Sequence, residues 1–200
     1  MRENCTSGIA PGAPGNRRSY GGGKTSTIKL LTLRSSTMAR PSFNTAWAAF
    51  MAVNVQVSEV GKKIGGNVQK NIDMPVGGFE NACPIRMSYV LNVTGFPIAK
   101  TSQYAMVSGA DNRQYIYRVG DMMNYLERAF GKPDKTVKSP KESDFASLKG
   151  IIVVKGHGWG NARGHVTLWD GRKCSDSCHL LHDPDNGPFI PETASIWTLK

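Results

Sequence analysis

A cysteine directly before a proline, at the start of a segment with helical periodicity, is the feature that most constrains how this chain can fold. Cys83 and Pro84 open a predicted helix that continues to about residue 92, and proline is best tolerated in the first turn of a helix. A thiol at that position feels the positive end of the helix dipole, which favours the thiolate. His165 opens a predicted strand much later in the chain. The fold must bring a helix start against a strand if these two side chains act together.

The hydrophobic pattern changes from helical to strand-like along the chain. The predicted helices lie near residues 43–51, 57–64, 83–92 and 121–130, and the predicted strands lie near residues 115–119, 151–155, 165–169 and 196–199. Helices that come first and strands that cluster late predict an α+β domain, with an N-terminal helical part packed on a small antiparallel sheet. In the strand at 165–169, Val166 and Leu168 share the side expected to face the core, so His165 is predicted to point toward a cleft.

Positive charge is concentrated at the beginning of the chain. The net charge is +10, but residues 1–40 hold seven Lys or Arg and one Glu, so residues 41–200 carry only +4. Residues 1–37 are rich in Gly, Ser and Arg, and we interpret them as a disordered or non-native extension before a single domain at 38–200. No basic stripe is interleaved with aromatic residues, and no segment reaches the roughly 20 apolar residues of a membrane span. We therefore expect neither nucleic-acid binding nor a membrane span.

The chain has four cysteines, which are Cys5, Cys83, Cys174 and Cys178. Cys174 and Cys178 are close enough in sequence to form a small-loop disulfide, which would leave Cys83 as a free thiol. One bridge together with one reactive thiol predicts activity in an oxidising compartment. The alternative for Cys83 is a buried, small hydrophobic side chain without a chemical role.

A cysteine and a histidine work better with a third group that fixes the imidazole tautomer. Two aspartates follow the predicted strand at 165–169. Asp170 precedes Gly171, which is typical of a tight turn. Asp176 lies between Cys174 and Cys178, where a disulfide would hold it rigidly. We favour Asp176 as the orienting carboxylate, while the spacing alone leaves Asp170 open.

A different function is suggested by the spacing of cysteines and histidines near the end of the chain. The side chains Cys174, Cys178, His179 and His182 form a C-x3-C-H-x2-H pattern, and thiolate and imidazole ligands at such spacings can bind zinc. A zinc-stabilised binding module without catalysis is therefore the alternative function. Four ligands crowded into nine residues leave awkward geometry, so we expect a disulfide, no metal and no cofactor.

A glycine-rich segment follows the predicted strand at 151–155. It contains His157, Gly158 and Trp159. These three residues are the candidates for substrate binding; the alternative for His157 is an exposed loop residue without a role.

At these residues the chain resembles the fourth family of type VI secretion amidase effectors, which are bacterial toxins related to NlpC/P60 and papain-like cysteine peptidases. The resemblance covers residues 39–200 and none of residues 1–37. The matching stretches are residues 40–44, 61–71, 81–89, 108–111, 155–159, 164–169 and 174–178. Several such stretches in order, at family-like spacing, make the resemblance highly specific.

The resemblance implies a papain-like fold and an amidase that cuts the peptide stem of peptidoglycan between D-glutamate and meso-diaminopimelate. It places the nucleophile on Cys83, the general base on His165 and the orienting carboxylate on Asp176, with a Cys174–Cys178 disulfide. It also implies delivery by the type VI secretion apparatus without a signal peptide, action in the periplasm of the recipient bacterium, and a cognate immunity protein. A housekeeping or phage-derived wall hydrolase of the same chemistry is the rival function.

Overall fold

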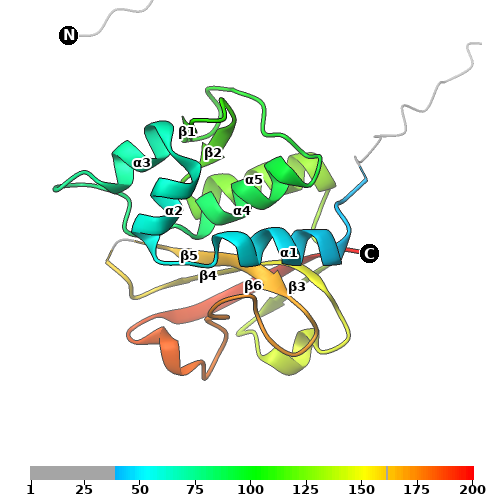
Figure 1. The fold of residues 1–200 in the computed structure, drawn as a ribbon. Coiled ribbons are helices and arrows are strands. Elements are labelled where there is room, and N and C mark those ends of the chain that lie inside the picture. The colour runs from blue at the N-terminus through cyan, green and yellow to red at the C-terminus, as the bar shows by residue number, and fades with distance from the viewer. Residues whose placement is uncertain (1–38, 161) are drawn as a thin grey trace, which may run out of the picture. The chain divides into compact units, whose positions relative to one another are not determined.

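The structure, a computed structural model, describes residues 39–160 and 162–200. The predicted extension at residues 1–37 lies outside the described residues. The elements are, in order, α1 (Phe43–Val53), α2 (Val57–Ile64), α3 (Gly66–Ile72), α4 (Cys83–Val93), β1 (Met106–Ser108), β2 (Gln114–Ile116), α5 (Val119–Phe130), β3 (Lys135–Lys138), η1 (Glu142–Phe145), β4 (Gly150–His157), β5 (Gly164–Trp169), η2 (Pro184–Asn186) and β6 (Ile190–Thr198) (Figure 1).

Helices and a four-stranded antiparallel sheet form the main body of the described residues, as the α+β prediction required. The strand order is β3-β6-β4-β5, and β1 and β2 form a separate antiparallel pair. Figure 1 shows α1, α4 and α5 along one side of the sheet. None of the helices in the described residues is long and apolar enough to cross a membrane.

The sheet is buried on both faces. In β4, Ile151 and Val153 pack into a core with the helices, whereas Ile152 and Val154 pack into a second core on the opposite face. Side chains from the segments around η1 and η2, including Phe145, contribute to that second core. A strand that is covered on both sides needs apolar residues at every position, which explains the uninterrupted hydrophobic run of β4.

The second core changes the expected environment of β5. Val166 and Leu168 face the helical core, as the alternation predicted. Trp169 lies on the other side of the strand and is fully buried in the second core, where its indole nitrogen donates a hydrogen bond to the carbonyl oxygen of Phe145 at 2.8 Å. The side of β5 that carries His165 is therefore open only near the beginning of the strand.

Helix α4 begins where the sequence predicted. Pro84 occupies its first turn, where the missing N–H would have had no partner within the helix. The preceding N-cap residue, Ala82, makes no side-chain cap, but the Asn81 side chain accepts a hydrogen bond from the backbone N–H of Cys83 at 3.1 Å. Helix α4 packs on β5, so its first residue comes to lie against the beginning of that strand.

Candidate active site

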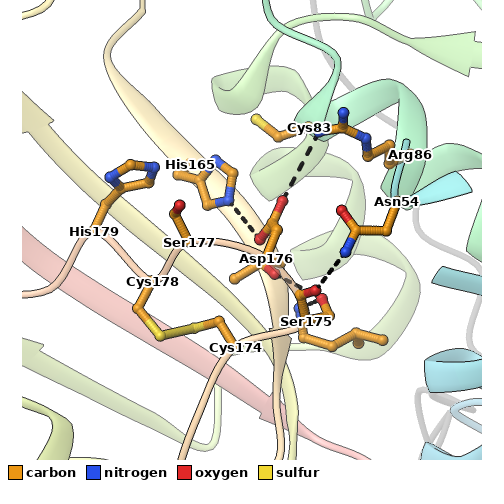
Figure 2. A network of polar contacts seen from close by, with 12 residues as sticks. Asn54, Cys83, Arg86, His165, Cys174, Ser175, Asp176, Ser177, Cys178 and His179 are labelled. Atoms are coloured by element: carbon orange, nitrogen blue, oxygen red, sulfur yellow. Dashed lines mark hydrogen bonds and ion pairs between the residues drawn. A yellow bond between two sulfur atoms is a disulfide. The ribbon is translucent and has the colours of Figure 1, made fainter. Parts of the chain in front are cut away.

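Cys83 is the free cysteine of the described part of the chain, and it is completely buried at the first position of α4. His165 is 6% exposed, and Cys83 is among the groups that raise its pKa, so the thiol lies within interaction range of the imidazole. Figure 2 shows the Cys83 side chain directed toward the His165 ring. The packing of α4 on β5 therefore joins the thiol and the imidazole that the sequence placed far apart.

The opposite side of the His165 ring is held by a carboxylate. Nε2 of His165 lies 3.0 Å from Oδ1 of Asp176 (Figure 2). Asp170, the open alternative, instead closes a turn, since its Oδ1 accepts hydrogen bonds from the backbone N–H groups of Arg172 and Lys173, each at 2.8 Å. Of the two aspartates, only Asp176 contacts the histidine.

The position of Asp176 depends on β5 being an edge strand. The free edge of β5 pairs with the chain that returns after the turn, since the N–H of Ser175 donates to the carbonyl oxygen of Leu168 at 2.8 Å. The Ser175 and Thr167 hydroxyls are also 2.8 Å apart. On its other side, Nδ2 of Asn54 donates to the carbonyl oxygen of Ser175 at 2.9 Å. The residue before Asp176 is thus held by both β5 and the end of α1.

The predicted Cys174–Cys178 disulfide is present, with a Cα–Cα separation of 5.3 Å. Asp176 lies inside the loop that this bond closes, so both of its flanking segments are restrained. The zinc alternative is wrong for this structure, because a disulfide removes both thiolates that the site would need. Within residues 39–160 and 162–200, no group of three or more His, Cys, Asp or Glu side chains could hold a metal ion.

Electrostatics favour a charged imidazole at His165. Burial by itself lowers the pKa of His165, but the charges of Cys83 and Asp176, and the hydrogen bonds to both, raise it from 6.5 to about 10. Burial raises the pKa of the Asp176 carboxyl, whereas His165, the hydrogen bonds from His165 and Thr167, and the charge of Arg86 hold it below its ordinary range. The site therefore stabilises an imidazolium beside an ionised carboxylate.

Two adjoining cavities lie beside the start of α4. One, of about 380 Å³, is lined by Asn81, Arg86, Trp159, Ala162, His165, Asp176, Ser177 and His179; we call it the catalytic cleft. The other, of about 460 Å³, shares Asn81 and Ala162 with the cleft and is also lined by Pro84. A larger cavity of about 710 Å³ lies beside the start of α1 and contains none of Cys83, His165 and Asp176. His165 and Asp176 therefore line the catalytic cleft and not the larger cavity.

The three candidate substrate-binding residues occupy different places. Trp159 lines the cleft, stacks on Phe189 with ring centroids 4.0 Å apart, and donates from its indole nitrogen to the carbonyl oxygen of Asn186 at 3.1 Å. Gly158 has φ +114°, and a Cβ there would lie 2.0 Å from the carbonyl oxygen of Pro188, so only glycine fits. His157 is the last residue of β4, is exposed, and directs Nδ1 to Glu192 at 2.8 Å. It is not among the residues that line the cleft.

Sequence reasoning gave no active-site role to His179, Arg86 or Asn81, which also line the cleft. The His179 ring lies edge-on to the His165 ring, with centroids 4.7 Å apart. Burial, followed by the positive charge of His165, lowers the pKa of His179 and keeps it neutral beside the imidazolium. The spacing of Arg86, one turn after Cys83 on a helix, was the one sequence signal that could have pointed to the arginine.

The fold and the site can be compared with known proteins. The family model "Tae4: Type VI secretion system (T6SS), amidase effector protein 4" matches residues 79–197. The effector Tae4 from Salmonella typhimurium, solved in complex with the immunity Tai4 from Enterobacter cloacae, is 68% identical with a TM-score of 0.77, over 80% of this chain and 100% of that chain. The type VI effector Tae4 from Enterobacter cloacae is 53% identical with a TM-score of 0.75, over 82% of this chain and 100% of that chain. A comparison with curated proteins found no match.

Proposed function

The chain belongs to the Tae4 family of type VI secretion system amidase effectors, and from that premise we propose that it hydrolyses the γ-D-glutamyl–meso-diaminopimelate bond of peptidoglycan stem peptides, with Cys83 as the nucleophile. The observation that carries this proposal is the arrangement of one imidazole between a free thiol and a carboxylate at the edge of a cleft. A papain-like relationship of the fold is part of the same proposal, since a cysteine at a helix start facing a histidine on a strand is the arrangement that such hydrolases use.

The mechanism follows from the order of the three groups. In the resting site His165 carries the proton that the Cys83 thiol gives up, and the thiolate attacks the γ-carbonyl carbon of the D-glutamyl residue. The C–N bond then breaks, His165 returns the proton to the departing amine of diaminopimelate, and a thioester remains on Cys83. Water, deprotonated by His165, attacks the thioester and releases the D-glutamyl carboxylate and the thiol. Asp176 holds the imidazole so that its other nitrogen faces the sulfur throughout.

The negative oxygen formed in each tetrahedral intermediate needs donors near Cys83. The backbone N–H of Cys83 lies at the helix start, but in this structure it donates a hydrogen bond to Oδ1 of Asn81 at 3.1 Å. We propose that the N–H transfers to the substrate oxygen when the substrate binds. Because its Oδ1 faces the backbone and its side chain lines both cavities, Asn81 can offer Nδ2 as a second donor.

The proposed activity is tested by mass spectrometry of purified disaccharide tetrapeptides after digestion with the full chain. We expect two products, a disaccharide dipeptide that ends in D-glutamate and a dipeptide that begins with diaminopimelate. The Cys83→Ala protein is the control, because any product it forms comes from a contaminating enzyme. Cleavage of a different bond would reject the substrate assignment, and no cleavage at all would reject the amidase proposal.

Family membership also bears on delivery and partners. Structures of Tae4 relatives contain a Tai4 immunity protein, and we propose that a cognate immunity protein of that kind covers the cleft of this chain. As a type VI secretion effector the chain is secreted into target cells, and we propose that it acts in their periplasm. We further propose residues 38–200 as the catalytic domain. If the chain were instead a housekeeping wall hydrolase, the rival function, no immunity protein would inhibit it.

Asp176→Ala is expected to lower kcat by about 100-fold, which is less than the loss of either Cys83 or His165, because the carboxylate orients the imidazole without exchanging atoms. The matched control is Asp170→Ala, on the same chain segment. It should keep activity within about twofold and lose a little stability, because its carboxylate caps a turn. Steady-state kinetics and melting curves measure both. A fully active Asp176→Ala protein with an inactive Asp170→Ala protein would reverse the assignment.

The Cys174→Ser/Cys178→Ser double variant is expected to lose about tenfold in turnover while its melting temperature falls by only a few degrees. A disulfide across so short a loop restricts few unfolded conformations, so its stabilisation lies at the low end of about 2–4 kcal/mol. Its local effect is larger, because Asp176 lies inside the loop and contacts His165. Kinetics and thermal unfolding of the same preparations test this. Unchanged turnover with a large fall in melting temperature would leave the disulfide as a structural staple only.

A further inference from the structure

Arg86 is a partly buried arginine in the catalytic cleft whose charge the proposed mechanism does not use. It follows Cys83 by three positions on α4, so the two residues lie on neighbouring parts of one helical face. Its side chain is 14% exposed, and its guanidinium lies beside Asp176 (Figure 2). Partial burial of a charge is costly unless the charge is paired or binds a ligand.

Two of the three guanidinium nitrogens hold the arginine in place. Nε donates to the carbonyl oxygen of Val53 at 3.0 Å, and Nη2 donates to the carbonyl oxygen of Val55 at 2.7 Å. Both carbonyls lie at or just beyond the end of α1, where the helix leaves its last C=O groups without partners. These bonds orient the planar guanidinium before any substrate arrives, so little entropy is lost when a ligand binds to it.

The third nitrogen, Nη1, makes no hydrogen bond within residues 39–160 and 162–200. It lies 3.9 Å from Oδ2 of Asp176, which is an ion pair but too long for a hydrogen bond. Asp176 already has a hydrogen bond with His165. Among the described residues that line the cleft, Arg86 is the one lysine or arginine. The cleft thus contains a fixed positive group, next to the nucleophile, with N–H groups left for an anion.

The substrate of the proposed reaction carries an anion in a matching position. When D-glutamate is linked through its γ-carbonyl, its α-carboxylate stays free, four bonds from the carbonyl carbon that Cys83 attacks. Four bonds of about 1.5 Å span roughly 5 Å, so the carboxylate stays close to the carbon under attack. When the α-carboxylate is converted to an amide, as in D-isoglutamine, the same position offers no negative charge to an arginine.

We propose that Arg86 is a specificity-determining residue that binds the free α-carboxylate of the D-glutamyl residue through Nη1, and so selects stem peptides with D-isoglutamate over those with its α-amide, D-isoglutamine. This inference rests on the proposed function of the same site. The ion pair with Asp176 keeps Nη1 turned toward the cleft while the carboxylate is absent. When the substrate binds, its carboxylate takes the hydrogen bonds that Asp176 is too distant to accept.

The test uses two synthetic stem peptides that are identical except at one group, D-isoglutamate in the first and its α-amide, D-isoglutamine, in the second. The wild-type protein should cleave the carboxylate peptide with a kcat/KM about 10- to 100-fold above that of the amide peptide, mainly through KM. Arg86→Gln should reduce this preference to within about twofold, and Arg86→Lys should retain part of it. Arg172→Gln, an exposed arginine that lines only the distant cavity, is the matched control and should keep the full preference.

A ratio of two substrates on one protein separates recognition from positioning. If Arg86 acted only through Asp176, Arg86→Gln would lower the rates for both peptides equally and the preference would survive, which would overturn the inference. A wild-type protein without any preference would overturn it as well. If the wild-type protein cleaves neither peptide, the proposed function itself fails. If Arg86 variants do not fold, the binding of both peptides to the Cys83→Ala protein, measured by calorimetry, gives the same ratio.

Discussion

Replacing Cys83 with alanine is expected to abolish peptidoglycan hydrolysis, with a loss of at least about 10⁴-fold in kcat. The thiol is the atom that bonds to the substrate, and neither His165 nor Asp176 can replace it because both only move or orient a proton. Residual turnover would come from substrate binding and from the donors for the negative oxygen, which remain in place. The measurement is product formation from purified muropeptides over long incubations, with wild-type protein diluted to calibrate the detection limit.

The Cys83→Ala protein should remain folded. Cys83 is completely buried in the core between the helices and the sheet, so its replacement removes one buried sulfur and leaves a small cavity that costs roughly 1 kcal/mol. Thermal unfolding and the circular dichroism spectrum check this directly. Near wild-type hydrolysis by a well-folded Cys83→Ala protein would show that another residue is the nucleophile. Loss of activity together with unfolding would leave the role of the thiol undecided, and Cys83→Ser would then serve as the isosteric variant.

His165→Ala is expected to be as inactive as Cys83→Ala, and the double variant should be no worse than either single one. The imidazole and the thiol work as one unit, so the loss of either removes the whole contribution and the two effects do not add. Kinetics of the two single variants and the double variant form a thermodynamic cycle that measures this coupling. Fully multiplicative losses would mean that the two residues act independently, contrary to the electrostatic interaction between them.

The stability that His165 contributes to the wild-type protein should depend on pH in a defined direction. Burial lowers the pKa of His165, but Cys83 and Asp176 raise it from 6.5 to about 10 in the folded protein. Because the folded-state pKa lies above the unfolded-state value, the charged imidazole stabilises the fold fully below pH 6.5, and this stabilisation disappears as the pH rises through about 10. The difference in melting temperature between wild-type and His165→Ala proteins should therefore shrink over that interval. A constant or growing difference would show that the imidazole is not charged in the folded state.

Several predictions drawn from local patterns agree with the structure, but β6 begins at Ile190 and not near residue 196, and α5 begins at Val119, inside the strand predicted at 115–119. Helix α4 begins at Cys83, with Pro84 in its first turn, and the β5 strand begins at Gly164, directly before His165. The Cys174–Cys178 disulfide is confirmed, and so is the family inferred from the sequence motifs. Shorter elements were missed, such as α3 and β3. Helix α3 is short and is separated from α2 by Gly65 alone, and β3 is a largely exposed strand rich in lysine. Neither element has the apolar periodicity on which such predictions depend.

The roles of the site residues stay predictions, but the structure decides which residues can meet. Asp176 contacts His165 because β5 is an edge strand whose free side pairs with the returning chain. The Asp170 carboxylate instead accepts hydrogen bonds within the turn that reverses the chain. The His179 ring packs against the His165 ring, whereas the sequence suggested His179 only as a zinc ligand. None of these contacts follows from spacing, because each depends on which strand lies at the edge of the sheet.

Arg86 and Trp169 show the same division between local and tertiary information. The sequence by itself determined that Arg86 follows Cys83 by one turn of a helix and that Trp169 shares a side of a strand with His165, because both facts depend only on backbone periodicity. Tertiary structure alone decided that the end of α1 would fix the guanidinium in the cleft, and that a second core would bury Trp169 while leaving His165 at its rim. The physical reason is that periodicity is a property of neighbouring residues, whereas burial and charge pairing depend on segments that packing brings together from distant parts of the chain.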